Sequence, residues 1–312
     1  MRWARGVRAG LSGIAALALL AACEMPVAPP PDDPGQRPPP TVPDQPTPSP
    51  ESEALRAYFS AVQASQLRQG LLRRDGGGPD TPYTATMLAR NFEQIAFFNE
   101  VSLPGRGAGS ETQLRRWAAP VRIKPVFGRT VPTEQRIQDR RDLRAFATRL
   151  DRVTGHPISV GAAQPNFYVA FASEDDRAEV LDEISDALGV SLDVLSTLSR
   201  DTYCAVVTFG GENGAAYQAA VALIRAENPA LLRLSCIHEE VAQGMGLPND
   251  SPSARPSIFN DDDEFALLTS HDEALLKMLY DDALRPGLRR AEARNIVLRL
   301  ARQITGEEEP AS

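Results

Sequence analysis

The stretch CIHEEVAQGMGLPND, residues 236–250, decides which fold this sequence is expected to adopt. On a helical wheel Ile237, Val241 and Met245 share one face with Leu234. Glu239, Gln243 and Gly246 share the opposite face. Gly246 is expected to end the helix, because glycine takes the left-handed backbone of a C-cap at little steric cost. The stretch therefore predicts a helix over residues 231–245 that carries a polar face and stops at a glycine turn.

Strands and helices alternate along the chain before this helix. Hydrophobic periodicity predicts strands at 120–127, 166–172, 202–209 and 217–225, and helices at 51–74, 84–100, 133–153, 173–188 and 192–198. Ser173, which three acidic residues follow, is expected to cap the helix that it opens. From residue 117 the order strand, helix, strand, helix, strand, strand, helix predicts an α+β fold.

The segment after the glycine turn contains PSIFN (256–260), an acidic run (261–264) and a further helix that TSHD (269–272) opens. Thr269 or Ser270 is expected to cap that helix. The acidic run predicts a solvated loop, with calcium binding as the alternative, although it lacks the spacing of an EF-hand. A last helix over 289–302 carries an apolar stripe and is expected to close the domain.

The 231–245 helix, its glycine turn and the helix after PSIFN resemble the corresponding elements of metzincin-type zinc peptidases. The metzincin motif is HExxHxxGxxH, or D in the last position. In this resemblance Glu240 stands at the position of the general base and Gly246 at the turn. Glu239 and Gln243 stand at the positions of two histidine ligands.

The third ligand position falls on Asn249, or on Asp250 if the register slips by one residue, and Phe259 stands where metzincins have the methionine of the methionine turn. The resemblance implies a metzincin-like α+β fold, with a small twisted sheet, an active-site-type helix, a glycine turn and C-terminal helices. The sequence is similar, more closely still, to the domain-of-unknown-function family 2927 of proteobacterial lipoproteins over 236–250, 256–261 and 275–287. Membership of that family implies the same fold and supplies no established activity.

Imidazole is the usual zinc ligand, whereas carboxylate and amide oxygens are harder donors. We therefore expect a degenerate, pseudo-peptidase domain with no cofactor, and zinc or calcium is the alternative. His238 cannot replace a missing ligand, because it points about 100° away from Glu239 on the helix. A pair of His238 and His271 across the cleft is a further alternative.

The expected function is non-catalytic binding of a polypeptide or an envelope polymer, which would pair with a strand edge in a cleft beside the 217–225 strand. The alternative is an atypical metal-dependent hydrolase, similar to a metallopeptidase, that uses Glu240 as general base. A third hypothesis treats the domain as a structural component of the envelope.

Residues 1–22 have the parts of a secretory signal peptide, namely arginines, a short apolar run over 11–20 and small residues before Cys23. LAAC (20–23) resembles a bacterial lipobox, which implies acylation of Cys23, with palmitate among the acyl chains, and a membrane anchor. Glu24 is not the aspartate associated with inner-membrane retention, so the lipoprotein rules imply the outer membrane, facing the periplasm. The inner membrane and the cell surface are the alternatives.

A linker is expected over 23–50, because residues 24–50 hold 12 of the 26 prolines of the chain. We expect an N-terminal helical region over 51–110, a metzincin-like domain over 111–306 and a disordered tail over 307–312. The helices of the 51–110 region either form a small subdomain or pack on the main domain.

Two cysteines, Cys204 and Cys236, remain once Cys23 carries lipid. Disulfides persist in exported proteins, so an even remainder predicts one bridge between them. Two buried free thiols are the alternative.

The acidic balance of the chain limits its partners. A net charge of −8 and an isoelectric point near 5.1 argue against nucleic acid, because phosphate binding requires a basic surface. The expected partners are the membrane, through the lipid on Cys23, and an envelope polypeptide or polymer.

Overall fold

The computed structural model describes residues 46–99, 109–211 and 214–308. The predicted signal peptide, Cys23, most of the linker and the last four residues of the tail lie outside the described residues. From Gln45 onward the chain forms one compact unit, and both N-terminal helices belong to it. No helix among the described residues is long and apolar enough to cross a membrane.

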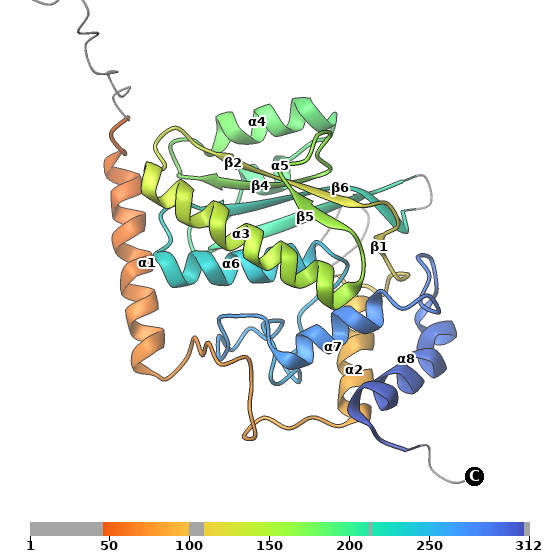
Figure 1. The fold of residues 1–312 in the computed structure, drawn as a ribbon. Coiled ribbons are helices and arrows are strands. Elements are labelled where there is room, and N and C mark those ends of the chain that lie inside the picture. The colour runs from red at the N-terminus through yellow and green to blue at the C-terminus, as the bar shows by residue number, and fades with distance from the viewer. Residues whose placement is uncertain (1–45, 100–108, 212–213, 309–312) are drawn as a thin grey trace, which may run out of the picture. The chain divides into compact units, whose positions relative to one another are not determined.

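A mixed sheet of six strands forms the centre of this unit (Figure 1). Its strands are β1 (Arg116–Trp117), β2 (Val121–Phe127), β3 (Ile158–Val160), β4 (Phe167–Ala172), β5 (Cys204–Gly210) and β6 (Ala216–Arg225). They lie in the order β1-β6-β4-β2-β3, and β5 pairs with β6 outside that path. β5 is antiparallel to β6, whereas the other pairs are parallel, so the fold is a mixed α/β fold with a largely parallel sheet.

Helices cover both faces of the sheet (Figure 1). They are α1 (Pro50–Arg68), α2 (Ala85–Ala96), α3 (Thr133–Thr154), α4 (Arg177–Leu188), α5 (Asp193–Ser196), α6 (Ala230–Gln243), α7 (Ser270–Leu279) and α8 (Arg290–Thr305). α4 and α5 lie over one face, and α3 and α6 lie over the other. α7 contacts α3, and α2 and α8 pack against each other and against α7.

The central strand β4 shows why the sequence folds this way. Phe167, Val169 and Phe171 belong to the large core cluster beneath α3 and α6. The intervening Tyr168 and Ala170 belong to the smaller cluster beneath α4 and α5. Because both faces of the strand are buried, its sequence NFYVAFA is an almost continuous apolar run, as is usual for parallel sheets with helices on both faces.

Two helices end earlier than their sequences predict, because the residues after them form main-chain hydrogen bonds with other segments of the chain. α1 stops at Arg68 rather than at residue 74, since the main-chain N–H of Leu72 donates to Asp263 O at 2.9 Å and that of Arg73 to Glu264 O at 2.7 Å. α2 stops at Ala96 rather than at residue 100, since residues 97–99 pair with residues 110–112. Sequence periodicity does not reveal partners so far along the chain.

Two predicted helix ends also need correction. Ser173 is not the cap of α4, because that helix begins after Asp176 and the Ser173 hydroxyl donates to the Asp176 carboxylate at 3.1 Å. α6 ends at Gln243 with Gly244 as its cap, and the turn continues to Gly246. Gly246 has φ +127°, and a Cβ there would lie 2.3 Å from Arg115 O, so the turn requires glycine.

The predictions for the C-terminal helices hold. Thr269 caps α7 in a capping box with Asp272. In α8 the predicted apolar stripe is turned inward, with Ala293, Val297 and Leu300 buried. α8 therefore closes the domain against α2 and α7.

Candidate functional site

A cleft of about 460 Å³ lies beside α6 and β5. α6 presents Glu239, Glu240 and Gln243 to it, so the polar helix face predicted from the sequence borders a cavity. β5 contributes Cys204 to Val206, and parts of the loops before β5 and after α6 complete the lining.

Two of the positions that the resemblance equates with metal ligands meet in this cleft. The Gln243 side-chain amide donates to Asp250 Oδ1 at 3.3 Å. The Asn249 amide is engaged elsewhere, since it donates to the main-chain carbonyls of Gln94 at 3.0 Å and of Asp250 at 2.8 Å. Of the two residues considered for the third position, Asp250 is the one that lines the cleft.

The atoms in the cleft that could act as metal ligands are mainly oxygens. Carboxylate oxygens of Glu239 and Glu240 and the sulfur of Cys204 lie within 4.8 Å of one another, and Glu240 is only 4% exposed. Cys204 is bonded to Cys236, so its sulfur is not a thiolate and is no zinc ligand. Oxygen donors favour hard cations, and this set therefore fits a zinc ion poorly.

His238 lies next to the candidate site residues in sequence but is not among the cleft lining. Its ring stacks on Phe146 with centroids 4.0 Å apart, and its Nδ1 accepts the main-chain N–H of Leu268 at 3.0 Å. Burial, helped by the positive charge of Arg149, lowers the pKa of His238 to about 3. This imidazole is a neutral packing element and hydrogen-bond acceptor.

His271 is likewise part of the core, fully buried at the start of α7. Its Nε2 lies 3.1 Å from the Asn91 amide nitrogen, and its ring packs edge-on against Tyr83. His238 and His271 are each engaged with other partners, and neither is part of the cleft lining. The structure therefore gives no support to the alternative of a His238–His271 pair across the cleft.

Phe259 is fully buried in the turn before α7. Its main-chain N–H donates to Ser257 Oγ at 3.0 Å, and Ser257 Oγ donates to the Asp272 carboxylate at 2.5 Å. Asp272 also accepts the Ile258 N–H at 3.0 Å. The cap of α7 thus fixes the turn around Phe259. The residues on either side of Phe259, Ile258 and Asn260, line the cleft.

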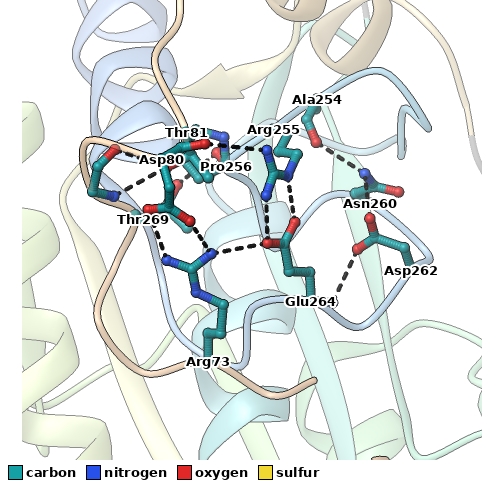
Figure 2. Close-up of polar contacts among 12 residues, drawn as sticks. Arg73, Asp80, Thr81, Ala254, Arg255, Pro256, Asn260, Asp262, Glu264 and Thr269 are labelled. Atoms are coloured by element: carbon teal, nitrogen blue, oxygen red, sulfur yellow. Dashed lines mark hydrogen bonds and ion pairs between the residues drawn. The ribbon is translucent and has the colours of Figure 1, made fainter. Parts of the chain in front are cut away.

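A network of ion pairs and hydrogen bonds holds the 254–264 loop in place (Figure 2). Glu264 lies between two arginines, accepting from Arg73 at 3.0 Å and from Arg255 at 2.6 Å. Arg73 also pairs with Asp80 at 2.7 Å. These two arginines lower the pKa of the Glu264 carboxyl below its usual range. Glu264, one of the four residues of the acidic run, is therefore structural rather than simply solvated, and nothing in the local sequence indicated this.

α1 also makes hydrogen bonds to residues that line the cleft. Gln66 Nε2 donates to Asp263 Oδ2 at 2.7 Å, and Tyr58 Oη donates to Asp201 Oδ1 at 3.1 Å. Both acceptors line the cleft. Burial, and then the neighbouring acids Asp262 and Asp261, raises the pKa of Asp263.

The cleft continues along β5. A second hollow of about 100 Å³ is lined by β5 residues from Ala205 to Thr208, and it shares Leu198, Ala205, Val206 and Gln243 with the cleft. We call the two hollows together the β5 groove. Within the residues that the structure describes, β5 pairs with β6 alone, so its other edge carries no strand.

This arrangement corrects the expectation that the 217–225 strand borders the cleft. That strand, β6, is internal, because both β4 and β5 pair with it at residues such as Ala220. Its apolar run AAVALI is buried for the same reason. The edge strand beside the groove is β5, whose residues are mostly half-buried.

A family model described as "Protein of unknown function (DUF2927)" matches residues 85–299, which include α2 and every later element up to most of α8. No curated protein and no solved structure matches this chain.

Proposed function

The chain belongs to the DUF2927 family, and we propose that it is a lipid-anchored binding protein of the cell envelope. In this proposal the β5 groove holds a polypeptide in extended form and does not cut it. The catalytic position of a peptidase has become part of a binding surface.

The observation that carries the proposal is the edge of β5 beside the groove. An extended peptide that adds to a sheet edge pairs its main-chain N–H and C=O groups with the strand, while alternate side chains enter the groove. β5 is also held in place, since Cys204 is bonded to Cys236 of α6. A rigid edge lowers the entropy cost of docking a flexible chain.

The proposal includes a metzincin-like fold. Its support is the order of elements along the chain, in which a helix with Glu239, Glu240 and Gln243 is followed by a glycine turn at Gly246, a buried turn at Phe259 and a further helix. The β5 edge and α6 would then correspond to the two walls of a peptidase cleft.

Binding without cleavage is supported by the donor chemistry of the cleft. Glu239, Gln243 and Asp250 offer oxygens, whereas a zinc peptidase needs nitrogen ligands for its metal. The second candidate function, a hydrolase with Glu240 as general base, draws on the burial of Glu240 in the cleft beside Glu239. A metal held by oxygen ligands would serve that function, and Glu240→Gln would abolish it.

The envelope location in this proposal comes from the sequence of residues 1–50. The signal peptide, Cys23 and the proline-rich linker would place the domain at a distance from the outer membrane, in the periplasm. Palmitate labelling of cells that express the protein is expected to be lost in Cys23→Ser. Labelling that persists in Cys23→Ser would contradict the anchor and leave the groove proposal untouched.

Binding and cleavage are separated by one experiment on the purified protein. A mixture of unstructured peptides is incubated with it, bound peptides are recovered by gel filtration, and their masses are measured. We expect full-length peptides to be retained by the wild type and by Glu240→Gln alike. Shortened peptides that disappear in Glu240→Gln, or stoichiometric zinc that is lost in Glu239→Ala, would contradict it.

A further inference from the structure

The outer surface of α3 carries more arginines than acids, although the net charge of the chain is −8. The exposed charged side chains of this helix are Glu134, Arg140, Arg141, Arg144, Asp151 and Arg152. Glu134 and Asp151 lie near the two ends of the helix, and a third acid, Asp142, is half-buried. The middle of the outer surface is therefore positively charged.

On its inner side α3 meets its neighbours through ion pairs. Arg233 of α6 pairs with the buried Asp139 at 2.8 Å. Glu273 of α7 pairs with Arg149 at 2.7 Å. β3, which also contacts α3, has no charged residue. The charges on the inner side thus balance one another, so the outer arginines determine the charge that α3 presents to the solvent.

An exposed apolar residue lies among these arginines. Ile137 is 57% exposed, the highest value among the large apolar side chains of the described residues. It shares one side of the helix with Arg141 and Arg144, because residues three and four apart are neighbours. At a membrane surface guanidinium groups bind lipid phosphates, while an apolar side chain between them enters the headgroup layer. We call Ile137, Arg140, Arg141, Arg144 and Arg152 the arginine face.

The N-terminal segment of the chain joins the domain close to this helix. α1, the first described helix, and α3 begin at the same end of the molecule (Figure 1). Arg56 of α1 and Gln135 of α3 both donate to the main-chain carbonyl of Ala226, at 3.5 Å and 3.1 Å. The segment that carries Cys23 is therefore attached near one end of the arginine face.

We propose that the arginine face of α3 lies on a membrane surface that contains anionic phospholipids. Charge complementarity favours this partner, since each arginine close to an anionic bilayer increases partition onto it about fivefold. A lipid on Cys23 would hold the domain near the bilayer, so a weak contact of this kind is enough to orient it. The proposal goes beyond the peptide-binding function and does not depend on it.

This contact would leave the β5 groove accessible. No residue of the arginine face lines either hollow of the groove. α3 connects β2 to β3, and β3 is the edge strand at one end of the sheet. β5 pairs with β6 at the opposite end. A domain that lies on α3 could therefore still receive a polypeptide at β5.

The experiment measures vesicle binding by the compact unit that begins at Gln45, which holds every described helix and strand and has no lipid. The protein is sedimented with phosphatidylcholine vesicles and with vesicles in which about one third of the lipid is phosphatidylglycerol. At low salt the anionic vesicles are expected to bind at least about tenfold more protein. High salt should remove most of this difference, because it screens the charges.

Charge is then removed from the arginine face and, in a control, from elsewhere. The triple variant Arg141→Gln, Arg144→Gln and Arg152→Gln should bind the anionic vesicles at least about tenfold more weakly. The control variant removes the same charge from exposed positions on α1, α2 and α8, through Arg68→Gln, Arg90→Gln and Arg299→Gln. It should bind nearly as well as the wild type, and circular dichroism checks that both variants are folded.

Equal binding to the two kinds of vesicle, or equal losses in the two triple variants, would overturn the proposal. An anionic polysaccharide that retains the wild type but not the arginine-face variant, when neither binds vesicles, would assign the face to a polymer and also overturn it. None of these results bears on the β5 groove or on acylation of Cys23, because neither involves the arginine face.

Discussion

Cys204, the first residue of β5, is joined by a disulfide to Cys236 of α6, with their Cα atoms 5.9 Å apart. The bridge connects the edge strand of the sheet to the helix that carries Glu239, Glu240 and Gln243, so the two walls of the cleft are covalently linked. The pairing predicted from the cysteine count is therefore present, and the alternative of two free thiols is wrong.

Loss of this bridge should destabilise the protein considerably. The cysteines are 32 residues apart, and closing a loop of that length is worth about 3–4 kcal/mol in the chain-entropy model. Cys204→Ser combined with Cys236→Ser should lower the free energy of unfolding in urea by about that amount. Reductant should do the same to the wild type and nothing further to the double variant, whereas a wild type insensitive to reductant would refute the prediction.

Gly246→Ala should cost more stability than an ordinary glycine substitution. Position 246 has φ +127°, and the new Cβ would collide with Arg115 O. We expect a loss of at least about 2 kcal/mol in the free energy of unfolding. Gly306→Ala is the control, since φ there is +73° with no atom within 4 Å of the Cβ, and it should cost only about 1 kcal/mol. Equal losses would show that the contact with Arg115 is unimportant.

His238 should make stability depend on pH in a defined window. Its folded pKa is lowered to about 3, so below its unfolded pKa, about 6.5, the unfolded chain binds a proton that the folded chain does not. This contribution to stability is therefore complete above about pH 6.5 and is lost as the pH falls towards 3, by at most about 1.4 kcal/mol per pH unit.

His238→Gln tests this directly, because glutamine can still accept the Leu268 N–H but does not titrate. Unfolding free energies of both proteins are compared between pH 7 and pH 4. The variant should be less stable at pH 7 and should lose less stability on acidification. Parallel curves for the two proteins would contradict the assignment.

A buried ion pair joins α3 to α6. Arg233 Nε lies 2.8 Å from Asp139 Oδ1, and both side chains are almost fully buried. Asp139→Ala would leave the guanidinium buried without its counter-charge, which should cost about 3–5 kcal/mol. Asp139→Leu combined with Arg233→Met should recover most of this loss in a urea titration. A double variant as unstable as Asp139→Ala would show that the pair contributes more than the avoidance of an unpaired charge.

Local patterns were enough to predict most elements of this fold. The strands at 120–127, 166–172, 202–209 and 217–225 each lie within two residues of β2, β4, β5 and β6. Their apolar content reflects burial in the sheet, which is a property of the segment itself. The cap at Thr269 was predictable for the same reason, since capping depends on residues three positions apart.

What the sequence did not reveal depends on contacts between distant segments. It predicted an α+β fold without indicating that the sheet is largely parallel, and it assigned the cleft to the strand β6 instead of the edge strand β5. The pairing of Arg73 with the acidic loop was not recognised either, because Arg73 is 191 residues from its partner Glu264. The polar face of α6 was found because it follows from helical spacing alone.

Amide hydrogen exchange of β5 with and without a bound unstructured peptide tests the central claim, that an extended polypeptide pairs with the edge of β5, most directly. In an antiparallel edge strand alternate N–H groups point away from the sheet, so about every second amide of β5 should exchange more slowly when the peptide is bound. The amides of α8 should be unaffected. Tight binding of the peptide with no change in exchange along β5 would contradict the account.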